Sequence, residues 1–296
     1  MKRAGVIGLG NMGSGLARNL IKAGFPTTGF DLDAGRMMAF HAMGGIPAES
    51  VGDVAKASDA IFVMVMTADQ ARDVILGDDG IVQRMEPGGT VILTATIGPL
   101  DARQIGEAMD GSGVDLIDSP VSGGFPGAQS GTLTLMAAGP DAALDRAEPF
   151  MTAVSKTIHR VGQRPGHGQT IKACLQSLMG SVFSATYEAA ALAAKAGVSG
   201  EVLHRVFSTS GAGCGIVDES LENIIDRRFE GTGSHIDTMH KDLTISLEFA
   251  GELGVPLHVA STALQVFRAG RSRFPTGDNQ VCTRVVEEII GAELHR

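Results

Sequence analysis

The sequence predicts an α/β domain with a doubly wound sheet, joined by a long helix to an all-α domain. Up to about residue 160, short apolar runs alternate with helical stretches. After Gly162 the strand pattern stops and helical periodicity continues. The Pro- and Gly-containing segment 163–168 is typical of a boundary, so we expect domains over residues 1–163 and 164–296.

The first domain is expected to contain one sheet. Nearly continuous apolar runs are typical of parallel strands covered on both faces, and they occupy residues 3–8, 60–66, 90–95 and 114–117. A second strand is expected to end at Asp31, and residues 133–138 and 157–161 are expected to extend the far edge. Helical stretches such as 12–23 and 101–110 lie between strands, which gives the strand–helix–strand repeat of a doubly wound sheet.

The second domain is expected to be helical throughout. Its first helix, over about 169–196, carries apolar residues at helical spacing and ends at Gly197. Further helices are expected over 200–208, 217–228, 237–253, 257–270 and 278–294. Apolar residues on several faces of the first helix indicate contact with a second subunit, so we expect a homodimer or homotetramer built through residues after about 163.

The composition argues against several classes of function. Lys and Arg number 24 against 33 Asp and Glu, and aromatic residues make up 4%, which disfavours nucleic-acid binding. The three cysteines (Cys174, Cys214, Cys282) are scattered and the eight histidines lack ligand spacing, so we expect no metal site and a reducing compartment. Without a signal peptide or a membrane-length apolar run, the chain is expected to be cytoplasmic.

A glycine-rich loop follows the first predicted strand and precedes a helix. The residues are Gly8-Leu9-Gly10-Asn11-Met12-Gly13, which fit G-x-G-x-x-G. In such loops the first glycine allows a tight turn, the second admits a pyrophosphate, and the third packs the helix against the strand. The helix N-terminus then faces the phosphates. A plain glycine turn is the alternative, but this position predicts a Rossmann-type dinucleotide-binding domain.

An acidic residue marks the end of the second predicted strand. Asp31 lies 21 residues beyond Gly10, where a carboxylate accepts hydrogen bonds from the ribose hydroxyls and repels a 2′-phosphate. We therefore expect NAD as the cofactor. Arg36 lies near enough in sequence to reach a phosphate, which leaves NADP open.

Two further segments carry groups suited to a substrate. Asp118 to Gly124 follows a strand, and Ser122, Gly123 and Gly124 offer a hydroxyl and unhindered N–H groups for a carboxylate, unless they form an ordinary turn. Lys172 lies near the start of the long helix, with Gln176 one turn later on the same face. Most helix lysines are solvated, so spacing alone does not make this lysine functional.

Together these segments resemble the β-hydroxyacid dehydrogenases, a family that includes 3-hydroxyisobutyrate, tartronate-semialdehyde and threonate enzymes. The glycine loop is similar to the family's cofactor loop, and Asp118 to Gly124 to its substrate segment. Residues 168–172 (Gly-Gln-Thr-Ile-Lys) resemble the catalytic-lysine segment, and residues 241–243 (Lys-Asp-Leu) a motif near the nicotinamide. The resemblance covers nearly the whole chain and implies an NAD(P)-dependent oxidoreductase that acts on a small hydroxy acid or its oxo form.

The resemblance also implies roles for individual residues. It implies catalysis by Lys172 as acid/base and substrate contacts from Ser122, Gly123, Gly124 and Gln176. It implies cofactor contacts from Gly8, Leu9, Gly10, Asn11, Met12, Gly13, Asp31, Met66, Thr67, Thr96 and Lys241. An ordinary lysine has a pKa near 10.4, so a lysine acting as a base near neutrality needs burial or a neighbouring cation, such as the nicotinamide or Lys241.

The chain departs from the family pattern after the lysine. Leu175-Gln176 stands where many members carry Asn-Asn and threonate-type members His-Gln, which leaves the substrate open. Three other functions stay open. A decarboxylating hydroxyacid dehydrogenase needs a basic phosphate site, for which Arg271 and Arg273 are the only late pair. Imine reductases usually lack the lysine, and a catalytically inactive cofactor-binding scaffold tends to replace it.

Overall fold

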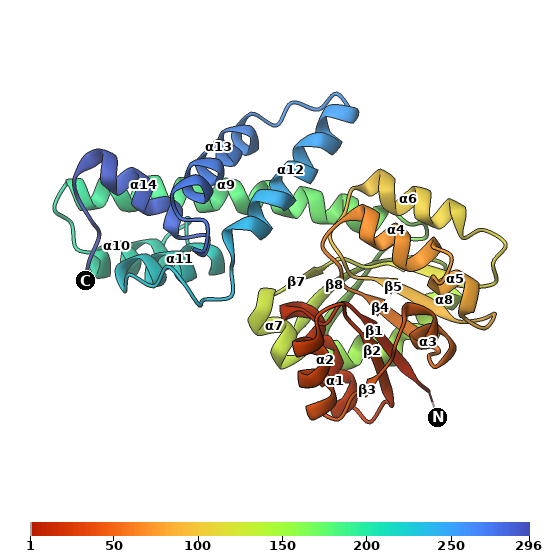
Figure 1. The fold of residues 1–296 in the computed structure, drawn as a ribbon. Coiled ribbons are helices and arrows are strands. Elements are labelled where there is room, and N and C mark those ends of the chain that lie inside the picture. Colours follow the sequence, from red (N-terminus) through yellow and green to blue (C-terminus); the bar gives the residue numbers. More distant parts are fainter. Residues whose placement is uncertain (1) are drawn as a thin grey trace. The chain divides into compact units, whose positions relative to one another are not determined.

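A nine-stranded sheet forms the centre of the first part of the chain in the computed structural model, which describes residues 2–296 (Figure 1). Backbone contacts divide the chain into two units, the first ending at Lys172 and the second beginning at Ala173. The strands follow the order β3-β2-β1-β4-β5-β6-β8-β7, and β9 pairs with β8. Their bounds are β1 Ala4–Ile7, β2 Thr27–Phe30, β3 Ile46–Pro47, β4 Ala60–Val63, β5 Thr90–Leu93, β6 Asp115–Asp118, β7 Val121–Ser122, β8 Leu133–Ala138 and β9 Ser155–Gly162.

The strands from β3 to β6 are all parallel, and β8 runs antiparallel to both β6 and β7. Alternate side chains of the parallel strands enter two different apolar clusters. Val6 and Phe62 belong to one cluster, while Ile7 and Ile61 belong to the other, and all four are buried. The sheet is therefore covered on both faces, which explains the continuous apolar runs in its strands.

Helices lie on both sides of the strands, with α1 and α2 on one side and α4 and α6 on the other (Figure 1). The helices of the first unit are α1 Asn11–Lys22, α2 Ala34–Ala42, α3 Val51–Lys56, α4 Ala68–Leu76, α5 Ile81–Arg84, α6 Pro99–Ala108, α7 Gly124–Ser130 and α8 Asp141–Val154. Helix α9 (His167–Lys195) begins in the first unit and continues into the second.

The second unit packs helices around one apolar core. Its other helices are α10 Gly200–Thr209, α11 Gly215–Ile225, α12 Ile236–Glu252, α13 His258–Arg273 and α14 Val281–Ile290. Phe183 and Tyr187 of α9 lie with Phe267 of α13 at centroid distances of 6.1–6.4 Å, which suits aromatic contacts. None of the helices within residues 2–296 has both the length and the apolar character needed to cross a bilayer.

The predicted fold class is confirmed, with differences at short elements and ends. Strands β3 and β7 have two residues each and were not predicted, because so short a strand is defined by its pairing partner. The last helix ends at Ile290 and not near residue 294, because Gly291 adopts a left-handed conformation with φ 62°. The helix also begins at Val281 and not at residue 278. Asp278 lies in the loop before it, where its carboxylate accepts hydrogen bonds from the backbone N–H and the hydroxyl of Thr232.

Candidate active site

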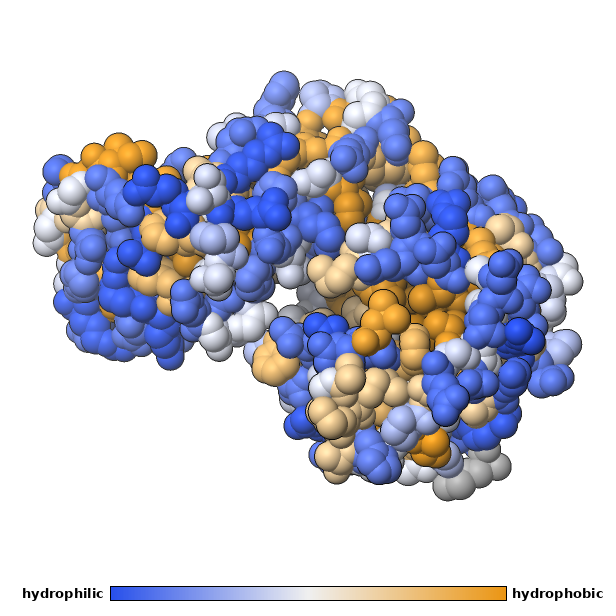
Figure 2. Space-filling model, viewed as in Figure 1, coloured by the Kyte–Doolittle hydropathy of each residue, from blue (hydrophilic) through white to orange (hydrophobic). Residues whose placement is uncertain are grey.

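Most of the predicted site residues of the first unit follow the carboxyl ends of neighbouring parallel strands. Gly8 follows β1, Asp31 follows β2, Met66 lies after β4, Thr96 after β5, and Ser122 after β6. Because these strands are neighbours in the sheet, the loops lie along one edge, where open α/β sheets bind ligands. In the space-filling view, an apolar area rimmed by hydrophilic residues lies where Figure 1 labels β4 and β5 (Figure 2).

The glycine loop has the close contacts that its pattern predicts. Gly8 has φ +87°, and a Cβ there would lie 2.2 Å from the Met64 carbonyl oxygen. A Cβ on Gly13 would lie 1.8 Å from the Gly8 oxygen, so no side chain fits at either position. Gly10 differs, because its nearest neighbour would be the Arg36 guanidinium at 3.8 Å. Gly10 is half-buried and precedes α1 directly, and the space beside its Cα is open to an incoming phosphate.

Asp31 binds the glycine loop from the end of β2. Its Oδ2 accepts a hydrogen bond from the Leu9 N–H at 2.7 Å, and Arg36 Nη1 lies 3.4 Å from the carboxylate. Arg36, a possible ligand for a 2′-phosphate, is thus paired with Asp31, the acid that is expected to repel such a phosphate. The carboxylate holds the loop and the guanidinium together at the ribose end of the predicted cofactor site.

The predicted cofactor contacts after β4 and β5 differ in their exposure and in their hydrogen-bond partners. Met66 is 58% exposed and donates its N–H to Gln70 Oε1. The Thr67 hydroxyl caps helix α4 by accepting from the Gln70 N–H at 3.2 Å, a structural use that needs no cofactor. Thr96 is half-buried between two backbone groups, of Ala95 and Ile97, that both bind the same glutamine side chain.

The predicted substrate loop combines a short strand with two glycines of positive φ. Ser122 ends β7 and pairs with Thr134 of β8. Gly123 and Gly124 have φ of 123° and 57°, conformations that favour glycine, and both are exposed. Their backbone is therefore accessible to a small ligand, which is compatible with a carboxylate site.

Lys172 is buried and touches the substrate loop. Its Nζ donates a hydrogen bond of 2.9 Å to the carbonyl of Val121, the residue before Ser122. A buried lysine is uncommon, so this side chain is not one of the solvated lysines that are typical of helix surfaces. The first unit therefore brings together Lys172 and the loop from Ser122 to Gly124.

Asp118 is a buried carboxylate at the end of β6, and the sequence analysis assigned no role to it. Its Oδ2 accepts from the N–H groups of Gly166 (2.8 Å) and Gln169 (3.1 Å), and its Oδ1 accepts from Gln169 Nε2 (2.9 Å). Burial raises the pKa of Asp118 to about 6, while the hydrogen bonds favour the ionised form and limit this rise. The signal that could have found it is an acid at the end of a strand within a recognised motif.

This carboxylate should make stability depend on pH. The pKa rises from 3.8 in the unfolded chain to about 6 in the folded chain, so the folded protein holds the proton longer. The resulting stabilisation is complete below pH 3.8 and is lost as pH rises through about 6. We expect the free energy of unfolding of the wild type, relative to Asp118→Asn, to fall by about 2 kcal/mol between pH 4 and pH 7. Urea unfolding at several pH values checks this, and a constant difference would contradict the shift.

Gln176 and Lys241 lie in the second unit. Gln176 Nε2 donates to Asp242 Oδ2 at 2.5 Å, and Lys241 Nζ lies 2.9 Å from Asp242 Oδ1. Gln176 Oε1 is buried and has no hydrogen-bond partner among the described residues. Asp242 thus orients the Gln176 amide so that Oε1 stays available as an acceptor. The spacing of residues along the sequence could not reveal this role of Asp242.

Helix α1 of the glycine loop packs directly on helix α7, which follows the substrate loop. Asn19 Nδ2 donates to the Ala128 carbonyl at 2.9 Å, and Gln129 Nε2 donates to the Asn11 carbonyl at 3.0 Å. A Cβ on Gly15 would lie 2.6 Å from the Ala128 backbone, so the two helices are as close as glycine allows. The predicted cofactor and substrate loops are therefore anchored to one another.

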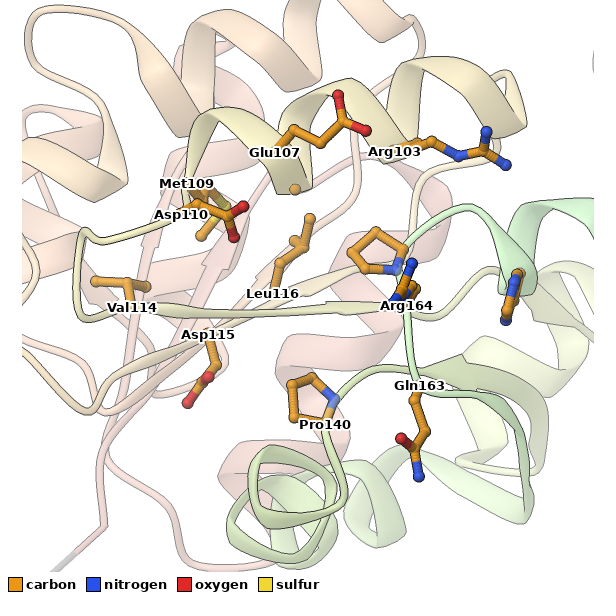
Figure 3. A pocket seen from close by; sticks show the side chains of 13 residues that line it. Arg103, Glu107, Met109, Asp110, Val114, Asp115, Leu116, Pro140, Gln163 and Arg164 are labelled. Atoms are coloured by element: carbon orange, nitrogen blue, oxygen red, sulfur yellow. The ribbon is translucent and has the colours of Figure 1, made fainter.

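A separate cavity of about 680 Å³ lies near the start of β6 and includes none of the predicted site residues (Figure 3). Arg103 and Glu107 of α6 lie on one side of it, and Arg164 follows β9 on the other. Its lining carries both signs of charge, with three acidic side chains (Glu107, Asp110 and Asp115) and two arginines (Arg103 and Arg164). Within residues 2–296, no three His, Cys, Asp or Glu side chains are grouped as metal ligands would be.

Two family models match the chain one after the other. Residues 3–162 match the NAD-binding domain of 6-phosphogluconate dehydrogenase. Residues 166–286 match the NAD-binding region of NADP-dependent 3-hydroxyisobutyrate dehydrogenase. The prediction of a nicotinamide dinucleotide cofactor is therefore confirmed, and the expected reaction class, hydride transfer by an NAD(P)-dependent oxidoreductase, agrees with both models.

Relatives of similar length support the same assignment. An L-threonate dehydrogenase of Escherichia coli O6:H1 is 35% identical over 89% of this chain and 87% of its own. A 2-(hydroxymethyl)glutarate dehydrogenase of Eubacterium barkeri is 30% identical over 99% and 97%. The crystal structure of a 3-hydroxyisobutyrate dehydrogenase from Salmonella typhimurium matches with a TM-score of 0.86 and 33% identity, covering 96% of this chain and all of that one. The chain belongs to the β-hydroxyacid dehydrogenase family of NAD(P)-dependent oxidoreductases.

Proposed function

We propose that the protein oxidises the carbinol carbon of a small hydroxy acid, with Lys172 as the acid/base group. The observation that carries this proposal is the buried Lys172 Nζ, held 2.9 Å from the Val121 carbonyl beside the Ser122–Gly124 loop. A proton-transfer group and a loop suited to a carboxylate are thus adjacent. Positioning of this kind places the hydroxyl group of a bound acid within reach of the amine.

The glycine loop fits a dinucleotide. Gly8 and Gly13 close the turn without side chains, and the position of Gly10 has room for a phosphate. Leu9 and Asp31 would hold the adenosine side, and Thr96 would lie near the nicotinamide. Lys241 is proposed as the cofactor contact that the second unit supplies. When bound, the cofactor supplies the hydride acceptor or donor.

The chain itself handles the proton and the substrate. Lys172 Nζ would take the hydroxyl proton on oxidation and return it on reduction, and the Val121 carbonyl fixes the direction of the amine. Ser122 and the N–H groups of Gly123 and Gly124 would bind the carboxylate. Gln176 Oε1, a buried acceptor, would bind a hydroxyl of the substrate, since leaving it unpaired is costly.

A substrate panel tests the proposal. Purified protein is mixed with NAD⁺ or NADP⁺ and with L-threonate, D-glycerate, 3-hydroxyisobutyrate, 3-hydroxypropionate or L-serine, and reduced cofactor is followed by absorbance. We propose threonate-like acids as the first candidates, supported by the L-threonate dehydrogenase named above and by the unpaired Gln176 acceptor, which suits an acid with a second hydroxyl. Tartronate semialdehyde is tested in the reducing direction. No turnover with any of these compounds would contradict the proposal.

Asp31 is expected to select NAD. Asp31→Ser removes the carboxylate that pairs with Arg36 and leaves the guanidinium available for a 2′-phosphate. The ratio of kcat/KM for NADP⁺ to that for NAD⁺ should rise by about tenfold or more. Asp33→Ser is the control, because Asp33 caps α2 through the Arg36 N–H and serine keeps this cap. A wild-type preference for NADP⁺ would contradict the assignment.

The second unit is proposed to form the subunit interface. Exposed residues follow one face of α9 within the second unit (Cys174, Leu178, Ala185, Glu188, Leu192 and Lys195), and four of these six are uncharged. Leu178 and Leu192 are 63% and 73% exposed, which fits a face covered by a second copy in a dimer or tetramer. Another apolar patch lies where Figure 1 draws α14 (Figure 2).

Light scattering should give a multiple of the 30.6 kDa chain mass at micromolar concentration. The double variant Leu178→Glu/Leu192→Glu should dissociate to monomers, because burying two carboxylates in an apolar interface is costly. Leu253→Glu, at a leucine that is 61% exposed beyond the end of α12, should keep the wild-type mass. A wild-type monomer with full activity would contradict the interface.

Two further proposals follow the sequence. We propose a domain boundary at 163/164, which is supported by the family models, since one ends at residue 162 and the other begins at residue 166.

We also propose a cytoplasmic location, supported by three cysteines that form no disulfide within the described chain. Fluorescent tagging at the C-terminus and microscopy would test the location.

A further inference from the structure

We infer that Asp118 and Gln169 are positioning residues that hold Lys172 and the Thr96 loop in place for catalysis. This inference rests on the proposed role of Lys172. The two side chains form a buried cluster, named here the Asp118–Gln169 clamp, that connects β6, the loop after β5 and the first turn of α9. Neither side chain is needed to contact the substrate.

The start of α9 lacks a cap of its own. Gly166, the residue before the helix, has no side chain, yet its carbonyl accepts the first helical hydrogen bond from the Thr170 N–H. Asp118 takes the place of a capping side chain, because its Oδ2 accepts from the N–H groups of both Gly166 and Gln169. A negative charge at this helix end is also favoured by the helix dipole.

The backbone approaches closely at the same point. A Cβ on Gly168 would lie 2.6 Å from the carbonyl oxygens of Asp118 and Met136, and one on Gly166 would lie 2.8 Å from the Pro99 oxygen. The first turn of α9 therefore rests directly on the strand ends. A shift of this turn would move Lys172, which follows Gln169 by about one turn.

Gln169 extends the clamp to the Thr96 loop. Its Nε2 donates to the Ala95 carbonyl at 2.9 Å as well as to Asp118, and its Oε1 accepts from the Ile97 N–H at 3.2 Å. The backbone on both sides of Thr96 is thus fixed by a single amide. One glutamine sets the position of a predicted cofactor contact relative to the helix that carries the lysine.

The hydrogen-bond polarity of the clamp admits only an acceptor at position 118. The Ala95 carbonyl and the Ile97 N–H fix which end of the Gln169 amide donates, so Nε2 must face residue 118. In Asp118→Asn, an amide NH₂ would replace one acceptor and face either this Nε2 or a backbone N–H. Rotating the Gln169 amide by 180° would give position 118 a donor's partner, but it would then place the Gln169 oxygen against the Ala95 carbonyl and the Gln169 NH₂ against the Ile97 N–H. A near-isosteric substitution therefore disrupts the clamp without changing its size.

The experiment compares Asp118→Asn and Gln169→Met with Asp115→Asn as the matched control. Asp115 lies at the other end of β6, where it pairs with Arg146 on the surface. We expect both clamp variants to lower kcat by about 10- to 100-fold, with less than about threefold change in KM and in the NADH dissociation constant. Amide hydrogen exchange over residues 164–172 should become about tenfold faster or more, and the control should match the wild type in every measurement.

Hydrogen exchange separates this inference from the proposed function, because it needs no substrate. If the substrate panel shows no turnover, faster exchange in the clamp variants still supports the clamp, while the role of Lys172 fails. Circular dichroism and thermal unfolding identify which variants are folded, and Gln169→Met provides the test if Asp118→Asn does not fold. Folded clamp variants with wild-type exchange, or with kcat within threefold of wild type, would overturn the inference.

Discussion

Replacing Lys172 by alanine is expected to lower kcat by about two to four orders of magnitude, the usual span for a general acid/base group. The physical reason is that the variant leaves the substrate hydroxyl without a proton acceptor beside the Val121 carbonyl, where Nζ now lies. NADH affinity should barely change, because the glycine loop and Asp31 are untouched. Steady-state kinetics and a fluorescence titration with NADH measure the two quantities.

Two further variants make this result specific. Lys172→Arg keeps the positive charge but cannot deprotonate, so it should be nearly as inactive as the alanine variant. Lys195→Ala removes a lysine at the end of the same helix, whose Nζ binds the Ile290 carbonyl, and should keep wild-type kcat. Turnover of Lys172→Ala within about threefold of wild type would remove this residue from the mechanism.

Alanine at Gly10 is expected to weaken cofactor binding while leaving the fold intact. A Cβ at Gly10 meets no atom closer than 3.8 Å, so the chain has room for it. The same Cβ would occupy the space in which the backbone approaches the pyrophosphate. We expect the dissociation constant for NADH to rise by about tenfold or more and the melting temperature to stay unchanged.

Gly13→Ala should behave differently, because its Cβ would lie 1.8 Å from the Gly8 oxygen and force the loop apart. We expect it to lower both stability and cofactor affinity. Gly251→Ala on α12 is the control, since a Cβ there has no neighbour within 4 Å and alanine favours a helix by up to about 1 kcal/mol. If Gly10→Ala binds NADH as the wild type does, the glycine loop is not the phosphate site.

The parallel strands and their loops could be predicted because their information is local. A strand buried on both faces is a continuous apolar run, and the glycine loop needs its residues at fixed spacing. Strand β7 has no such pattern, since Val121 and Ser122 are a strand only through pairing with β8. The start of α9 at His167, two residues before the predicted start, likewise depends on a carboxylate from β6.

The sequence analysis also missed contacts between side chains that are distant in the sequence. The pairing of Gln176 with Asp242 joins α9 to α12, and nothing in either segment alone predicts it. Thr67 shows the opposite case: its local pattern also fits a helix cap, and in the structure the hydroxyl has that use. Sequence position identifies which residues are near a site, while hydrogen-bond partners identify what each side chain does.

The unbroken course of α9 constrains how this enzyme can diverge. Lys172 and Gln176 occupy consecutive turns of one helix that runs from His167 to Lys195 without interruption. Each residue advances an α-helix by about 100°, so a single inserted residue between them would swing Gln176 and everything after it around the axis by that angle. A substitution leaves this angle unchanged. We therefore expect insertions and deletions between these two residues to be purged by selection, while substitutions accumulate.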